Sequence, residues 1–229
     1  MAAVASGLLV LLLAGAIIYK RSTDPLRARE SYDAGDRLLK VARYQQAILS
    51  FDQAVALKPD FAGAYFLRGK AYVANSEIER AIADFSKVIE LSPRDTQALV
   101  ARGAAYLEKK DYKAAISDAT KAAAIDPNLA SAHNLRGMAI RAQGDPRAAL
   151  ADFDRAVELA PSEDNYYQRA ATYQILGEHR KAVADFDQVI AFRPDGPPAY
   201  FARAESRRAM GDIQGAKQDH QRGRVLDGR

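Results

Sequence analysis

Small and large apolar residues recur at fixed levels along most of the chain, and their spacing predicts pairs of amphipathic helices. One alanine returns every 33 or 34 residues, at Ala47, Ala81, Ala115, Ala149, Ala182 and Ala216. A proline keeps the same interval, at Pro59, Pro93, Pro127, Pro161 and Pro194. Because proline ends a helix, each interval is expected to hold two helices and the turn that joins them. A period of this length is typical of stacked helical hairpins.

The prolines define the units of the chain. When each proline takes position 32 of its unit, six units follow one another, at residues 28–61, 62–95, 96–129, 130–162, 163–196 and 197–229. Position 8 is always glycine or alanine, position 20 is always alanine, and position 24 is phenylalanine in four of the six units. Small residues let two helices approach, and large ones fill the space between hairpins. A single hairpin cannot bury its apolar face, so the units are expected to stack.

This pattern resembles the tetratricopeptide repeat (TPR) family, from Ala28 to about Asp227. The resemblance implies an all-α fold, a right-handed superhelix built from six helical hairpins. It also implies that the concave surface, lined by the first helix of each hairpin, binds peptides or partner proteins. The expected function is therefore that of a scaffold or adaptor that recognises a protein or peptide partner.

Position 7 departs from the family, which often has leucine there, because five units carry arginine. Position 23 of the same five units is aspartate, always sixteen residues later, whereas the first unit has Ala34 and Ser50 at these positions. On antiparallel helices the two positions lie within reach of a guanidinium group. We therefore expect a structural ion pair in each hairpin. The pairs are Arg68 with Asp84, Arg102 with Asp118, Arg136 with Asp152, Arg169 with Asp185, and Arg203 with Asp219.

Position 5 of the first helices is mostly apolar and is predicted to line the groove that binds the partner. Polar residues at positions 9 and 12 would border this strip. The predicted groove residues are Tyr32, Phe66, Lys70, Val100, Asn134, Arg141, Tyr167 and Phe201. The alternative interpretation of the strip is ordinary packing between neighbouring first helices.

The composition offers no basis for catalysis. The chain has no cysteine and three histidines, which fall at repeat positions occupied elsewhere by core or turn residues. It has no glycine-rich phosphate loop and no histidine pair at ligand spacing, so we expect no catalytic residue, metal, cofactor or small-molecule substrate. Basic residues are scattered among 29 acidic ones, and the net charge is +4, so nucleic acid is not an expected partner.

The N-terminus is a separate element. Residues 2–19 contain no charged side chain, and Lys20 and Arg21 follow them. We expect residues 1–19 to form a hydrophobic transmembrane anchor, joined to the repeats by a linker at 20–27. The excess of basic residues after the apolar run favours a single-pass protein with its repeats on the cytoplasmic side. A cleaved signal peptide is the alternative, because Ala14-Gly15-Ala16 has the form of a cleavage site.

Three functional hypotheses follow from this organisation. In the first, a membrane-tethered scaffold recruits a protein partner near the bilayer and supports assembly of a membrane or envelope complex. In the second, signal cleavage leaves a periplasmic or secreted adaptor. In the third, the chain is a structural protein that associates with its own copies as a homo-oligomer, through the position 5 strip.

Overall fold

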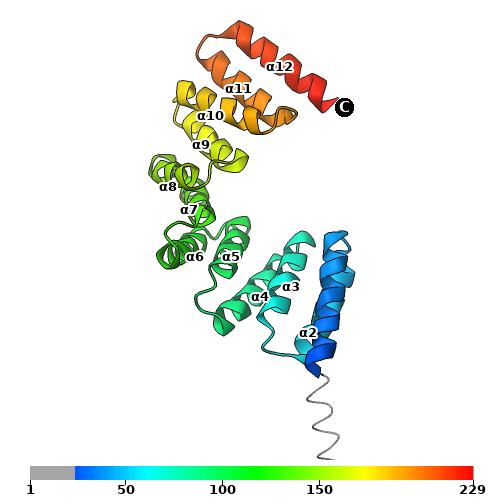
Figure 1. Cartoon of the computed structure of the whole chain (residues 1–229). Helices are drawn as coiled ribbons and strands as arrows, with labels where there is room; N and C mark the ends of the chain where they lie inside the picture. The colour runs from blue at the N-terminus through cyan, green and yellow to red at the C-terminus, as the bar shows by residue number, and fades with distance from the viewer. Residues whose placement is uncertain (1–23, 229) are drawn as a thin grey trace, which may run out of the picture. The chain divides into compact units, whose positions relative to one another are not determined.

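The computed structural model describes residues 24–228, and every regular element in that part of the chain is a helix (Figure 1). A first helix covers residues 24–40. The helices that follow it are α2 (Tyr44–Leu57), α3 (Ala62–Ala74), α4 (Ile78–Leu91), α5 (Thr96–Glu108), α6 (Tyr112–Ile125), α7 (Ala130–Gln143), α8 (Pro146–Leu159), α9 (Glu163–Ile175), α10 (His179–Phe192), α11 (Pro197–Ala209) and α12 (Ile213–Asp227).

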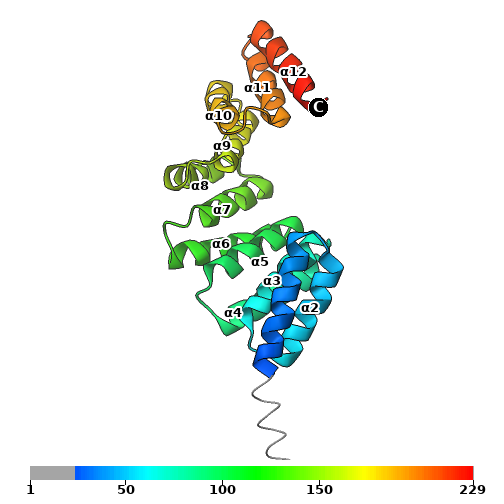
Figure 2. The same cartoon turned by 45° about the vertical axis from the view of Figure 1, so that its right-hand side comes forward.

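The chain forms two compact units, Met1–Ala98 and Leu99–Arg229, with the division inside α5. In the first unit, α3 packs against both α2 and α4. In the second unit, the hairpins α7–α8, α9–α10 and α11–α12 form, and each also packs on the hairpin before it. The first helices of successive hairpins, α7, α9 and α11, are also in contact. Figure 2 shows the helices from α6 to α12 following one another in chain order. Within each unit, helices that are neighbours in sequence are therefore also neighbours in space, as in a helical-repeat stack.

A close approach between a small residue at position 8 and a phenylalanine at position 24 occurs in several hairpins, whereas in the third, where position 24 is Ala119, Leu135 lies beside Gly103 instead. Phe51, Phe85, Phe153 and Phe186, all at position 24, are fully buried on the second helices. A methyl group added to Gly69 would lie 2.6 Å from Cε1 of Phe85, and one added to Gly35 would lie 2.6 Å from Cε1 of Phe51. The ring thus leaves no room for a side chain larger than a methyl group at position 8, which accounts for the small residues there.

The turn within each hairpin passes through a left-handed backbone conformation at position 15. Gly144, Gly177 and Gly211 occupy it in the last three repeats, with φ values of 111°, 74° and 84°. The first three repeats place Ala42, Ser76 and Lys110 at the same position, with φ values of 57°, 61° and 62°. Residues with a side chain adopt this conformation at a cost that glycine does not have. The last three turns are therefore relaxed, and the first three store backbone strain.

The predicted hydrophobic helix at 1–19 lies outside the described residues. Within 24–228, no helix combines the length and the apolar character needed to cross a membrane. The right-handed sense of the predicted superhelix stays a prediction.

Candidate protein-interaction groove

Five arginines at position 7 each form an ion pair with an aspartate on the second helix of the same hairpin. In every pair, Nε and Nη2 of the arginine donate to the two carboxylate oxygens, over distances between 2.6 and 2.9 Å. The aspartates are at most 7% exposed. This two-bond geometry is the strong form of the arginine–carboxylate interaction. The paired residues are Arg68–Asp84, Arg102–Asp118, Arg136–Asp152, Arg169–Asp185 and Arg203–Asp219.

Arg68, Arg169 and Arg203 also reach the preceding repeat. The remaining Nη1 of Arg68 donates to Asp52 at 2.7 Å, and that of Arg169 donates to Asp154 at 2.9 Å. Arg203 makes the same contact with Asp187. These aspartates, all at position 25, were missed in the sequence analysis, although their spacing from the arginines is nearly constant. The position 7 arginines are thus occupied by internal partners and have a structural role.

The residues at position 5 share their surface between the core and solvent. The rings of Phe66 and Tyr167 lie 5.7 Å from those of Phe85 and Phe186, the position 24 residues of their own hairpins. Tyr32 stacks on Phe61, and Phe201 packs on His220. Each position 5 ring is half-buried. Part of the predicted groove strip therefore packs on the second helix of its own hairpin, which differs from the packing between neighbouring first helices given as the alternative interpretation.

The other predicted groove residues lie in different surroundings. Lys70 is exposed on α3. Val100 on α5 and Asn134 on α7 line one shared hollow, whereas Arg141, at the end of α7, turns toward α9. The structure therefore brings together two of the eight predicted residues in one concavity and places the rest along their separate hairpins.

This concavity, named here the α5–α7 hollow, has a volume of about 360 Å³. It is lined by Val100, Ala104, Leu107, Glu108, Ser131, Asn134, Leu135 and Met138. Val100, Leu107 and Met138 are only half-buried, so the hollow presents apolar surface to solvent. Leu107 and Met138 lie at positions 12 and 9, so the apolar lining extends beyond the position 5 strip.

Asn134 is the buried polar side chain in the lining of the α5–α7 hollow. It is 7% exposed, and its Nδ2 donates to Oδ2 of Asp164 at 2.6 Å. Its Oδ1 is buried and accepts no hydrogen bond from any residue in 24–228. A buried acceptor without a donor is costly. The hollow itself combines the apolar side chains of Val100, Leu107, Leu135 and Met138 with the exposed polar side chains of Glu108 and Ser131, an arrangement suited to a peptide segment.

Side chains at position 12 connect successive first helices in the second unit. Nη1 of Arg141 donates to the backbone oxygen of Gln168 at 2.9 Å and to Oγ1 of Thr172 at 3.0 Å. Nε2 of Gln174 makes the matching bonds, to the backbone oxygen of Ala202 and to Oγ of Ser206, both at 2.8 Å. The sequence carried a signal for these contacts. Where position 12 is Leu39, Val73 or Leu107, position 10 of the next repeat is alanine, and where it is Arg141 or Gln174, that position is Thr172 or Ser206.

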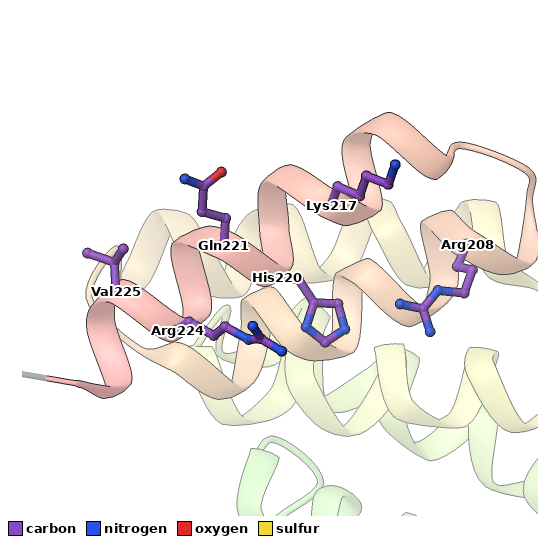
Figure 3. Close-up of a pocket in the computed structure, with 6 residues that line it drawn as sticks. All are labelled: Arg208, Lys217, His220, Gln221, Arg224 and Val225. Carbon is purple, nitrogen blue, oxygen red and sulfur yellow. The ribbon is translucent and has the colours of Figure 1, made fainter.

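A second hollow, of about 410 Å³, lies on the last repeat (Figure 3). Lys217, His220, Gln221, Arg224 and Val225 line it from α12, and Arg208 lines it from α11. Glu205 lies 3.5 Å from both Arg208 and His220 and offsets part of the positive charge. Neither hollow holds a metal-binding group, since no cluster of three or more histidine, aspartate or glutamate side chains with suitable geometry occurs within 24–228.

Solved structures share this fold. TTC0263, a thermophilic TPR protein of Thermus thermophilus, is 18% identical, with a TM-score of 0.67, and the match covers 78% of this chain and 98% of that one. MamA from Desulfovibrio magneticus RS-1 is 21% identical, with a TM-score of 0.65, and the match covers 73% and 96%. YrrB, described as a TPR protein with an unusual peptide-binding site, is 24% identical, with a TM-score of 0.58, and the match covers 76% and 90%.

Comparison with curated protein sequences found no significant match. The family profiles described as tetratricopeptide repeat match residues 32–95, 66–130, 130–163 and 164–195. These segments include most of the chain, and the hairpins, the buried phenylalanines and the small residues at position 8 agree with them. The chain therefore belongs to the tetratricopeptide repeat family.

Proposed function

We propose that the chain is a protein-interaction scaffold whose groove along α5, α7 and α9 binds a segment of a partner protein. The α5–α7 hollow is the observation that supports this proposal, because Val100, Leu107 and Met138 leave apolar surface uncovered there. Leu135, which also lines the hollow, is buried beside Gly103, whereas Val100, Leu107 and Met138 are half-buried and keep surface available to a partner. YrrB, which shares the fold, has a peptide-binding site, a property consistent with the proposal.

A site-specific crosslinking experiment tests the groove. A photoreactive residue replaces Met138, inside the α5–α7 hollow, and in a matched protein it replaces Lys121, which is exposed on the second helix α6. We expect one partner to be captured by the first protein and not by the second. The crosslinked segment, identified by mass spectrometry and synthesised, should then bind the full-length chain in solution.

The variant Met138→Glu provides the second half of this test. A carboxylate in the apolar hollow has to be desolvated when the partner binds, so the affinity for the synthesised segment should fall by about tenfold or more. Lys121→Glu, an exposed change on α6, should leave the affinity unchanged. Equal capture by both photoreactive proteins, or full affinity of Met138→Glu, would reject the groove as the binding site.

We further propose that residues 1–19 tether this scaffold to a membrane, with the repeats on the cytoplasmic side. The uncharged run at 2–19 and the basic residues after it support the proposal. Leu11→Arg with Leu12→Arg should release the full chain from the membrane fraction, because charges at the centre of an apolar span oppose insertion. Mass measurement separates this proposal from the alternative, since an adaptor produced by signal cleavage would lack its first residues. The accessibility of the repeats to protease in intact cells tests on which side of the membrane they lie.

A further inference from the structure

Arg141 and Gln174 perform the same task in successive repeats. Each lies at position 12 and donates to the backbone oxygen at position 6 and the hydroxyl at position 10 of the next first helix. The donor–acceptor distances are alike, at 2.9 and 3.0 Å for Arg141 and at 2.8 Å for both bonds of Gln174. A neutral amide is therefore sufficient to connect two repeats at this position. The positive charge of Arg141 has no part in that connection.

Among residues 24–228, no carboxylate accepts a hydrogen bond from Arg141, although Asp164 lies near enough for its charge to oppose the lowering of the Arg141 pKa by burial. Its Nη2 donates to Oε1 of Gln168 at 2.6 Å, and its Nε donates to no described residue. In the position 7 arginines, by contrast, the edge formed by Nε and Nη2 is filled by an aspartate, as for Arg136 and Asp152. The nearest acid in the network, Asp164, accepts hydrogen bonds from Asn134 and from Gln168 instead.

The partly buried surroundings of Arg141 make its positive charge unfavourable in the absence of an anionic partner. Burial lowers the pKa of Arg141, whereas a hydrogen bond to Asp185 raises that of Arg169. The Arg141 guanidinium lies 5.3 Å from the ring centre of Phe153, and its hydrogen-bond partners are neutral, an amide side chain, a backbone oxygen and a hydroxyl. A half-buried cation of this kind gains from an anion brought by a ligand, since the attraction is little screened by water.

Because Arg141 is one arginine and not part of a cluster, it also limits which kind of anionic group can bind. A phosphate group, with nearly two negative charges, is recognised by clusters of arginines, whereas one guanidinium edge matches one carboxylate. We propose that Arg141 binds the side-chain carboxylate of an aspartate or glutamate in the partner segment that occupies the α5–α7 hollow. The inference rests on the proposed function, which it narrows to an acidic, partly apolar segment.

The positions along α7 set the spacing within that segment. The α5–α7 hollow is centred near the level of Asn134 and Met138, and Arg141 follows them on the same helix. At 1.5 Å per residue, the separation along the helix is roughly 5 to 10 Å. An extended segment advances about 3.3 Å per residue, so its acid should lie two or three residues from the apolar side chain in the hollow.

Selection from a random peptide library displayed on phage tests the proposal with the full-length chain. The wild-type protein, Arg141→Gln and Arg180→Gln are each used as bait, and selected peptides are then measured by fluorescence anisotropy. Arg141→Gln places at position 12 the amide that Gln174 shows to be sufficient. Arg180 is exposed on α10, so its replacement is a control with the same loss of charge. Circular dichroism checks that all three proteins are equally helical.

Wild-type and Arg180→Gln baits should select peptides with an acid two or three residues from an apolar residue, and Arg141→Gln should bind them about tenfold more weakly. Arg141→Lys, which keeps the charge but loses the planar edge, should recover part of the affinity. Selected peptides without an enriched acid, or equal binding to Arg141→Gln, would overturn this inference and leave the groove proposal standing. If no peptide is selected by any bait, both proposals fall. If Arg141→Gln unfolds, the peptides selected by the wild-type protein still test the inference, because they either are or are not enriched in an acidic residue.

Discussion

Removal of one partner from a position 7 ion pair should cost far more stability than removal of a surface charge. Asp152 is 7% exposed and accepts hydrogen bonds of 2.9 and 2.6 Å from Arg136, and Nδ1 of His133 lies 3.5 Å away. In Asp152→Ala, a guanidinium whose side chain is only 26% exposed loses its counter-charge. Loss of one partner of a buried pair costs about 3 to 5 kcal/mol. Because Arg136 keeps some contact with water, we expect a loss of about 3 kcal/mol, at the lower end of that range.

The double variant Arg136→Met with Asp152→Leu separates the ion pair from its individual charges. Replacement of both partners by apolar residues removes the uncompensated charge, so the double variant should lie within about 1 kcal/mol of the wild type. Glu158→Gln on the same helix is the control, because its pair with Arg155 is largely exposed and should be worth less than about 0.5 kcal/mol.

Urea unfolding of the full-length chain, followed by circular dichroism at helical wavelengths, measures these differences. The slope of the transition must stay constant among variants for the comparison to hold. Two results would refute the reasoning. One is a stability of Asp152→Ala within about 0.5 kcal/mol of the wild type, because a loss that small is typical of a solvated pair. The other is a loss of stability in the double variant as large as the sum of the losses in Arg136→Met and Asp152→Leu made separately.

Three further predictions concern the repeat frame and can be measured by the same unfolding assay. Gly69→Leu should destabilise the chain by about 3 kcal/mol because the Phe85 ring fills the site. Gly69→Ala should cost about 1 kcal/mol or less, since Ala170 already occupies this position beside Phe186. Equal losses of stability in the two variants would contradict the packing argument. Ala42→Gly should stabilise the first turn by about 0.5 to 1 kcal/mol, as its φ is 57°, and a loss of stability would show that the turn is not strained. Gln174→Leu should cost about 1 to 2 kcal/mol through its lost hydrogen bonds, and an unchanged stability would remove its role in joining the repeats.

The helical-hairpin fold could be predicted from the sequence because the packing contacts recur at the same interval of 33 or 34 residues as the sequence pattern. Small residues such as Gly69 and large ones such as Phe85 stand at fixed levels, and each makes its contact inside one hairpin or with the next. The sixteen-residue interval from Arg68 to Asp84 likewise spans a single turn, so helical geometry alone predicts that the two can meet.

The site was harder to predict because it depends on contacts between repeats and on how deep each side chain lies. Phe66 and Tyr167 alternate with the core positions as groove residues would, yet their rings share contacts with Phe85 and Phe186. Met138 belongs to the α5–α7 hollow but lies at a position where other repeats have alanine or a charge. Hydropathy along one helix does not reveal which neighbour covers a side chain.

The connection at position 12 has a consequence for how these repeats can change over time. Arg141 and Gln174 donate to main-chain oxygens, of Gln168 and Ala202, and the two side chains at that receiving position differ completely in size and polarity. The backbone oxygen is present whichever residue supplies it at position 6, whereas the hydroxyl of Thr172 or Ser206 at position 10 has to be kept. The residue at position 6 can therefore change, and with it the surface offered to binding partners, while the connection between adjacent hairpins persists.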